Sequence, residues 1–276
     1  MNRRNILIAG GDIRQIYCGE RLSRDFTVSY AGFDKSDITS ANGKYGCVVL
    51  PVPPPDSTGK IYTPLWDKSL YIADIKALLT DDALIFAGTN PDKTAEFFPY
   101  HKVYSYAEQE AFSLKNAIST AEGAILLALQ ELPVTLSGLP VLIVGMGRIG
   151  TALANILKGF GSDITAAVRN GRGAAKAALL GVKAISTDDI TGNFSLVFNT
   201  APNLIFTEEL IADFPENTLF IDLASNPGGF DFKGAEAMGR KVIHALGLPA
   251  KKAPVTAGYD VADTIIDIIN ERGKCL

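Results

Sequence analysis

The feature that most constrains the fold is an apolar run that ends in a glycine-rich turn. Residues 141–144 are apolar and largely β-branched, and Gly145-Met146-Gly147-Arg148-Ile149-Gly150 follows them directly. Apolar residues then recur at helical spacing as far as Leu157. This pattern predicts a buried parallel strand, a tight turn and a helix.

The three glycines of this turn have separate physical roles. Gly145 permits the turn, Gly147 lets the backbone approach a pyrophosphate, and Gly150 lets the helix pack against the strand. Arg148 and Ile149 stand at the start of the helix, where free N–H groups bind phosphate. We therefore predict that these five residues bind a dinucleotide.

The next strand indicates which dinucleotide. The apolar segment 163–168 ends at Arg169, where an NAD-binding chain usually has an Asp or Glu for the ribose 2′-hydroxyl. Here Arg169, Asn170 and Arg172 form a loop whose guanidinium groups suit a 2′-phosphate. We predict NADP(H) as the cofactor. NAD(H) stays open, as does a glycine-rich turn with solvated arginines and no cofactor.

Two later strand ends complete the predicted cofactor site. Small and polar residues follow the apolar segments 196–198 and 218–222, at the edge of a parallel sheet where ligands bind. We expect these residues to line the nicotinamide half of the site: Asn199, Thr200, Ala201, Pro202, Leu223 and Ala224.

The length of 276 residues suits two domains. Another apolar strand, over residues 5–9, ends in Gly10-Gly11-Asp12, but this turn lacks the third glycine and its Asp would repel a pyrophosphate. We predict an α/β fold of two Rossmann-like domains with parallel sheets and an active site in the cleft between them.

The predicted boundaries follow from the long helical pattern before the glycine turn. Residues 1–115 form a substrate domain, completed by a returning C-terminal helix within 256–276. Residues 116–255 form the NADP-binding domain, including a linker helix over 116–131. The Pro-, Gly- and Lys-rich segment 247–258 is interpreted as a loop, with the final helix running from Tyr259 to Glu271.

Composition excludes several other classes of protein. A net charge of −4 argues against nucleic acid as a partner, and no apolar run approaches the ~20 residues that span a bilayer. The apolar segment behind the N-terminus is too short for a signal peptide. Three scattered cysteines have no metal-ligand spacing and fit a reducing cytoplasm. We expect no metal site, and the oligomeric state, including a homo-oligomer, stays open.

Five segments together resemble one specific family, the A subunits of dipicolinate synthases. They are Gly10-Gly11-Asp12-x-Arg14, Thr120-Ala121-Glu122-Gly123, the glycine turn, Asn199-Thr200-Ala201-Pro202, and Ala224-Ser225-x-Pro227-Gly228-Gly229-x-Asp231-Phe232. The resemblance covers essentially the whole chain. It implies NADP-dependent oxidation of dihydrodipicolinate, or of its hydrated precursor, to dipicolinate. It also implies that the partner is a flavoprotein-like B subunit, in the cytoplasm of the mother cell of a sporulating bacterium.

A heterocyclic dicarboxylate needs cations and neutral donors around its carboxylates. The candidates for substrate binding are Arg14, Asn116, Thr120, Ser225 and Lys252. The general base is unknown from the sequence. Asp12 and Glu122 are weak candidates, because either would serve only if burial raised its pKa.

Two other functions stay open. The cofactor domain is similar to those of D-2-hydroxyacid dehydrogenases, although no arginine follows Ala224 where such an enzyme usually has one. The second alternative is a non-catalytic dinucleotide-binding sensor or scaffold, because no base is evident.

Overall fold

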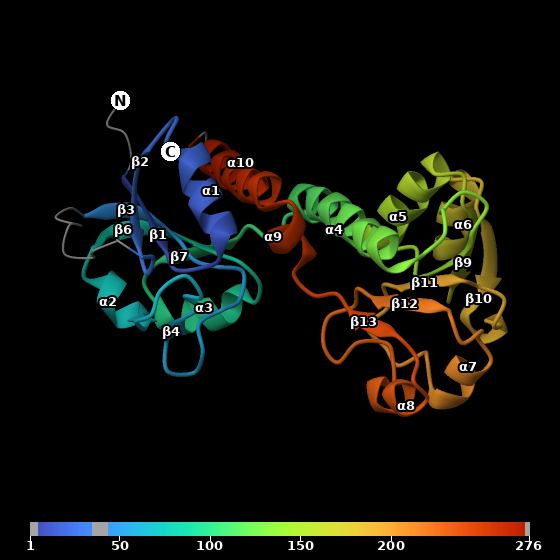
Figure 1. Cartoon of the computed structure of the whole chain (residues 1–276). Helices are drawn as coiled ribbons and strands as arrows, with labels where there is room; N and C mark the ends of the chain where they lie inside the picture. The colour runs from blue at the N-terminus through green and yellow to red at the C-terminus, as the bar shows by residue number, and fades with distance from the viewer. Residues whose placement is uncertain (1–4, 35–43, 274–276) are drawn as a thin grey trace. The chain divides into compact units, whose positions relative to one another are not determined.

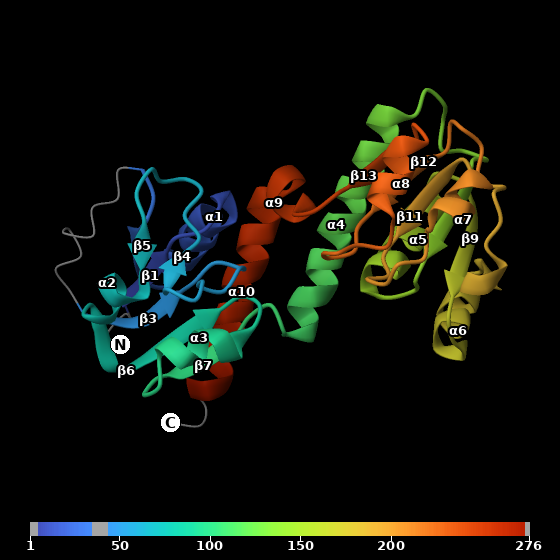
Figure 2. The same cartoon turned by 90° about the horizontal axis from the view of Figure 1, so that it is seen from below.

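The computed structural model describes residues 5–34 and 44–273, which form two compact α/β units (Figures 1 and 2). Unit 1 comprises residues 1–116 and 253–276, and unit 2 comprises residues 117–252. Residues 1–4 of the predicted substrate domain, and residues 35–43 within it, lie outside the described residues. So do residues 274–276 of the predicted C-terminal helix.

Unit 1 contains a five-stranded parallel sheet in the order β2-β1-β3-β6-β7. Its strands are β1 (Asn5–Ala9), β2 (Thr27–Ala31), β3 (Tyr45–Val49), β6 (Leu79–Ala87) and β7 (Lys102–Ser105). The short strands β4 (Lys60–Ile61) and β5 (Leu70–Tyr71) pair antiparallel. The helices are α1 (Ile13–Leu22), α2 (Ile72–Lys76), α3 (Pro91–Phe97) and α10 (Pro254–Gly273), and α4 (Glu110–Glu131) begins here.

Alternating side chains of the unit 1 strands supply two separate cores, one on each face of the sheet. Ile6 and Ile8 of β1 pack with α1 and α10, whereas Leu7 and Ala9 pack on the opposite face with α2. Strands buried on both faces are typical of parallel sheets. The C-terminal helix α10 lies beside α1 on one face, so the chain returns to the N-terminal sheet (Figure 1).

Unit 2 contains a six-stranded parallel sheet in the order β10-β9-β8-β11-β12-β13. Its strands are β8 (Pro140–Val144), β9 (Asp163–Val168), β10 (Lys183–Ser186), β11 (Leu196–Asn199), β12 (Leu219–Asp222) and β13 (Val242–His244). Its helices are α5 (Arg148–Gly159), α6 (Gly171–Leu179), α7 (Glu208–Ala212), α8 (Phe232–Ala237) and α9 (Leu248–Lys252), with a 3-10 turn at Thr187–Asp189.

The same alternation builds unit 2. Val141 and Ile143 of β8 face a core closed by α4 and α5, while Leu142 and Val144 face a core that includes residues of α7 and α8. Helices α4 and α5 cover one face of this sheet, and α7 and α8 cover the other (Figure 1). The strand order reverses between β8 and β11, and such a switch point is where an open parallel sheet binds its ligand. The predicted class of two Rossmann-like folds with parallel sheets is confirmed.

The prediction of a loop over residues 247–258 is wrong. Residues 248–252 form α9, and α10 begins at Pro254, five residues before the expected start at Tyr259. The physical reason is that proline is favoured in the first turn of a helix, because its fixed φ suits the helix and its missing N–H is not needed there. Pro249 and Pro254 both stand at such positions.

Candidate functional site

The glycine turn after β8 needs glycine for steric reasons that are visible in its backbone. Gly145 has φ of +90°, which L side chains rarely adopt. A Cβ on Gly150 would lie 1.9 Å from the carbonyl oxygen of Gly145, so a side chain there would force α5 away from β8. A Cβ on Gly147 would meet nothing within 4 Å, so Gly147 is not required by packing within the chain.

The start of α5 suits a phosphate. Gly147 is its N-cap residue and provides no side-chain hydrogen bond. In contrast, α6 is capped by Asn170, whose side chain accepts a hydrogen bond of 3.0 Å from the N–H of Gly173. The first N–H groups of a helix lack partners within it, so those of α5 are suited to an anion. Arg148 is exposed at this end, and Ile149 packs against the core of unit 2.

The two arginines lie at the same edge of the sheet as the glycine turn. Strand β9 pairs parallel with β8, with Ala167 opposite Val144, so the ends of the two strands are adjacent. Arg169 follows β9 directly and Arg172 lies in the first turn of α6, and both are exposed. Because Asn170 caps α6, its side chain holds this loop.

The ends of β11 and β12 are tied together by a buried polar network. The Nδ2 of Asn199 donates to Asp222 Oδ1 over 2.8 Å and to the carbonyl of Ala201 over 2.9 Å. The hydroxyl of Thr200 donates to the carbonyl of Val144 over 2.8 Å. Asn199 and Asp222 are both fully buried. The side chain of Asn199 therefore holds the strand ends together.

The segment after β12 is organised by Asp222, which sequence reasoning did not single out. Its carboxylate accepts from the N–H of Ala224 over 3.1 Å and from that of Gly229 over 2.8 Å. The carbonyl of Ala224 lies 3.0 Å from His244 Nε2. Leu223 and Ala224 are both buried. An acid at the end of an otherwise apolar strand was the available signal for this network.

Pro202 and Ser225 are exposed, one beyond each of these two strand ends. Parallel pairing of β11 with β12 places Asn199 opposite Asp222, so these two segments leave the sheet side by side. The structure thus gathers the predicted cofactor residues at one edge of unit 2.

The predicted substrate residues divide between the two units. Arg14 and the half-buried Asn116 lie in unit 1, and Thr120, Ser225 and Lys252 lie in unit 2. Thr120 is buried on α4, and Lys252 is exposed at the end of α9. A Cβ on Gly123 would lie 3.4 Å from Lys252 Cγ, so the stem of this lysine packs on α4.

The condition for Asp12 to act as a general base is not met. Burial raises the pKa of Asp12, but its hydrogen bonds with Arg14 and the charge of Arg14 outweigh burial and hold the pKa below its usual value. The second candidate, Glu122, is exposed on α4 and does not lie in a buried environment.

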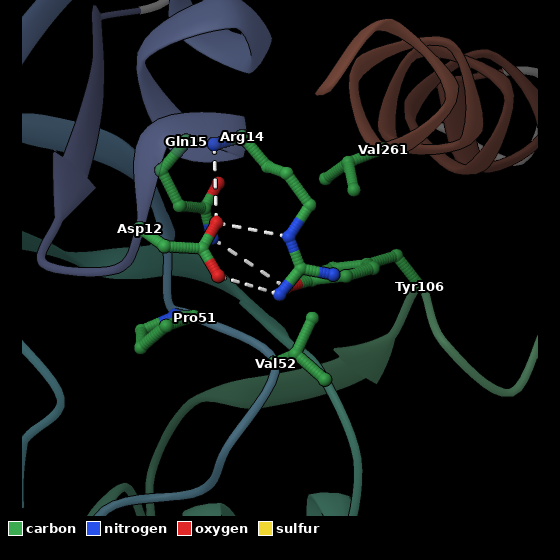
Figure 3. Close-up of a pocket in the computed structure, with 7 residues that line it drawn as sticks. All are labelled: Asp12, Arg14, Gln15, Pro51, Val52, Tyr106 and Val261. Atoms are coloured by element: carbon green, nitrogen blue, oxygen red, sulfur yellow. Dashed lines mark hydrogen bonds and ion pairs between the residues drawn. The ribbon is translucent and has the colours of Figure 1, made fainter. Parts of the chain in front are cut away.

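Asp12 and Arg14 line a narrow pocket of unit 1 at the ends of its strands (Figure 3). Arg14 donates from Nε to Asp12 Oδ1 over 2.9 Å and from Nη2 to Oδ2 over 2.7 Å. The rest of the lining comes from Gln15, Pro51, Val52, Tyr106 and Val261. Sequence reasoning missed Gln15 and Tyr106. A polar Gln15 on the buried face of α1, in line with Cys18 and Leu22, was the signal.

The described residues contain neither a metal-binding cluster nor a membrane-spanning helix. Within residues 5–34 and 44–273, no group of three or more His, Cys, Asp or Glu side chains is arranged to hold a metal ion. In the same part of the chain, no helix has the length and apolar character needed to cross a bilayer.

Two family models match the chain, one for each unit. The model of the N-terminal domain of the dipicolinate synthase A subunit matches residues 5–107, and that of the D-isomer specific 2-hydroxyacid dehydrogenase NAD binding domain matches residues 118–225. The second match indicates a nicotinamide dinucleotide as cofactor. The chain is thus an oxidoreductase of the dehydrogenase type that uses such a dinucleotide.

Particular relatives narrow this class. The chain is 28% identical over 285 residues to the dipicolinate synthase A subunit of Bacillus subtilis, covering 96% of each. The crystal structure of the dipicolinate synthase A subunit from Bacillus halodurans matches with a TM-score of 0.86 at 27% identity, covering 96% of this chain and 97% of that one. The chain is therefore a relative of the dipicolinate synthase A subunits, and the resemblance predicted from the sequence is confirmed.

The likeness to hydroxyacid dehydrogenases is more distant. The apo-structure of D-lactate dehydrogenase from Escherichia coli has a TM-score of 0.63 at 16% identity, covering 98% of this chain and 97% of that one. At this identity the likeness shows a common fold and nothing more.

Proposed function

We propose that this chain is the A subunit of a two-subunit dipicolinate synthase. It oxidises dihydrodipicolinate, or its hydrated precursor 4-hydroxy-tetrahydrodipicolinate after loss of water, to dipicolinate, with NADP as the oxidant. The observation that carries this proposal is the presence in one chain of the two matched domains, an N-terminal domain of the dipicolinate synthase type and an NAD-binding domain. The partner is a flavoprotein-like B subunit, and the setting is the mother cell of a sporulating bacterium.

The residues of unit 2 fit a dinucleotide on steric grounds. The uncapped start of α5 offers N–H groups, and Gly147 leaves space in front of them. Arg169 and Arg172 supply exposed positive charge at the neighbouring strand end, where NADP has its 2′-phosphate. When bound, NADP supplies the hydride acceptor. Ala201, Pro202, Leu223 and Ala224 would flank the nicotinamide, in positions fixed by the Asn199–Asp222 network.

The substrate domain of residues 1–115 and 256–276 would bind the ring, and the cofactor domain of residues 116–255, which includes the linker helix 116–131, would bind NADP. Five residues would contact the two carboxylates and the ring: Arg14, Asn116, Thr120, Ser225 and Lys252. Oxidation removes a hydride and a proton from the ring, and aromaticity supplies driving force. The protein therefore has mainly to orient the ring.

The experiment follows the absorbance of the reduced nicotinamide. A fresh dihydrodipicolinate pool, made in situ by its upstream synthase, is mixed with NADP and the chain, with and without the B subunit. We expect reduced cofactor and pyridine-2,6-dicarboxylate to appear together. If both stay absent with the partner present, while NADP still binds tightly, the catalytic proposal fails and the sensor alternative is favoured.

A parallel reaction tests the D-2-hydroxyacid alternative, which the match of residues 118–225 keeps open. D-lactate and longer D-2-hydroxyacids replace the dihydrodipicolinate pool at the same cofactor concentration. Reduction of the cofactor with these substrates alone would replace the proposed reaction with a hydroxyacid oxidation.

A further inference from the structure

A histidine of unit 2 holds a backbone carbonyl just beyond the end of β12. Strand β13 pairs parallel with β12 and places His244 opposite Asp222 (Figure 1). His244 Nε2 lies 3.0 Å from the carbonyl oxygen of Ala224. Because a carbonyl oxygen only accepts, Nε2 carries a proton and donates it. The ring of His244 stacks on that of Phe232, with centroids 5.0 Å apart, so the direction of this donor is fixed.

The backbone of Ala224 is thus held at both ends. Its N–H donates to Asp222 Oδ1 over 3.1 Å, and its carbonyl accepts from His244. A peptide group is planar, and in its trans form the N–H points away from the C=O. Fixing the carbonyl of Ala224 therefore also fixes the direction of the N–H of Ser225.

Ser225 is the first residue beyond this support, and it carries two donors. It is exposed, and its carbonyl accepts from the N–H of Gly228 over 2.9 Å. Its own N–H and hydroxyl have no hydrogen-bond partner within residues 5–34 and 44–273. Both lie at the carboxyl end of a parallel strand, where an open sheet binds its ligand. Two donors on one residue suit the oxygens of a carboxylate.

The negative charge nearest to this position, on Asp222, is compensated. The Asp222 side chain is fully buried. It accepts from Asn199 Nδ2 over 2.8 Å, and from the N–H groups of Ala224 and Gly229 over 3.1 and 2.8 Å. A carboxylate at Ser225 would therefore meet neutral donors, with the charge of Asp222 turned to its own three partners.

From this arrangement we infer that His244 is a positioning residue for the substrate. It holds the Ala224 carbonyl, and through this peptide it directs the two donors of Ser225 toward one carboxylate of the ring. The inference rests on the proposed function, in which Ser225 contacts the substrate. It adds a residue that does not touch the ring itself but sets how tightly the carboxylate is bound.

The test uses the full chain with its B subunit and measures two ligands separately. His244→Phe keeps a ring against Phe232 but removes the N–H donor. We expect about a fivefold rise in KM for the dihydrodipicolinate pool and in the inhibition constant of pyridine-2,6-dicarboxylate, as for one lost hydrogen bond. The dissociation constant of NADPH, from fluorescence titration, should not change, because Asn199 and Asp222 still hold the strand ends together.

His244→Gln separates the hydrogen bond from the ring. The amide of Gln can donate to the Ala224 carbonyl, so this variant should bind pyridine-2,6-dicarboxylate as the parent does, although the stacked ring is lost.

His101→Phe, in unit 1, is the matched control. His101 Nε2 lies 3.3 Å from the carbonyl of Thr80, and its ring lies edge-on to Phe98. The control therefore loses the same kind of contact as His244→Phe, and it should leave the constants for both ligands unchanged.

A measurement on the parent tests the inference even if the His244 variants do not fold. The amide resonance of Ser225, in the chain loaded with NADP, should shift when pyridine-2,6-dicarboxylate is added, because the N–H gains an acceptor. An unchanged resonance in the presence of bound pyridine-2,6-dicarboxylate would overturn the inference.

Three results with folded variants would overturn it while the proposed function stands. The first is parent-like KM and product inhibition in His244→Phe. The second is equal weakening in His244→Gln and His244→Phe, since the ring and not the hydrogen bond would then matter. The third is an equal fall of NADPH affinity in His244→Phe, which would assign His244 to the cofactor. If the parent neither oxidises the pool nor binds pyridine-2,6-dicarboxylate, the proposed function fails and the inference fails with it.

Discussion

Both units contain a strand, a glycine turn and a helix in succession, but the residue at the start of the helix differs between them. In unit 2, β8 leads through Gly145 to Gly147, which caps α5 without a side chain. In unit 1, β1 leads through Gly10 and Gly11, both with positive φ, to Asp12. The Asp12 carboxylate accepts a hydrogen bond of 3.1 Å from the backbone N–H of Arg14 at the start of α1.

This difference shows how one fold serves two tasks. In unit 1 the protein's own carboxylate occupies the place where an anion would bind, and it also holds Arg14. In unit 2 the place is open, and two arginines follow the next strand. An Asp at the N-cap position accepts a hydrogen bond from the first N–H groups of the helix. A Gly at this position has no side chain to do so, and these groups then suit a phosphate. Four changes test this comparison.

The largest effect is expected from Gly150→Ala. The new Cβ would lie 1.9 Å from the Gly145 carbonyl oxygen, a backbone atom that cannot move without moving β8 or α5. We expect a loss of about 3 kcal/mol in the free energy of unfolding, at the upper end for overpacking. Urea unfolding followed by far-UV circular dichroism measures it. Gly147→Ala is the control, since its Cβ would contact nothing, and an equal loss there would contradict the steric argument.

Gly147→Asp makes the start of α5 resemble that of α1. Gly147 has φ of −76° and ψ of −161°, a conformation that aspartate adopts readily. We expect stability to rise by a few tenths of a kcal/mol, because an Asp cap is slightly better than a Gly cap. Dinucleotide affinity should fall about a hundredfold, because a carboxylate would face the pyrophosphate. Fluorescence titration with NADPH measures the affinity. Parent-like binding would show that phosphates do not lie at this helix start.

Asp12→Asn tests the closed helix start of unit 1. It leaves the Arg14 guanidinium mostly buried without a charged partner, and we expect a loss of about 2 kcal/mol in the free energy of unfolding. The control is Asp25→Asn, whose ion pair with Arg21 is exposed and should contribute little.

The stabilisation that Asp12 gives the folded parent depends on pH, and the Asp12→Asn variant lacks this dependence. The pKa of Asp12 is lower in the folded chain than its usual value of 3.8, so its stabilisation is complete above about pH 4 and is lost as the pH falls through the folded pKa. The parent should therefore lose stability more steeply than Asp12→Asn below pH 4. Parallel curves would show that Asp12 and Arg14 are not coupled.

The sequence predicts the strand–turn–helix of unit 2 well, because its glycines, apolar run and helical spacing are all local. It also predicts the parallel sheets, since buried strands are apolar on both faces. The start of α10 was missed because Pro254 was interpreted as part of a loop, although a proline also suits a first helical turn.

The pocket of unit 1 could not be predicted in this way. Gln15, Leu50 and Tyr106 come from three distant segments, and their hydrogen bonds depend on how β1, β3 and β7 are ordered in the sheet. The pKa of Asp12 could not be predicted from the sequence either, because it depends on the contacts of Asp12 with Arg14. The sequence placed Arg14 two residues away, but only the geometry showed two hydrogen bonds that lower the pKa of the carboxyl.

The smallest effect is expected at the loop that distinguishes NADP from NAD. Arg169 and Arg172 are exposed, so their attraction for a 2′-phosphate is screened by solvent and salt. Replacing both by alanine should weaken NADP binding about tenfold and leave NAD binding unchanged. At high salt the difference in NADP affinity between parent and variant should largely disappear. Lys183→Ala, an exposed cation on β10, controls for net charge. Equal affinity of the parent for NAD and NADP would remove the role of both arginines, while the open start of α5 would still account for the pyrophosphate.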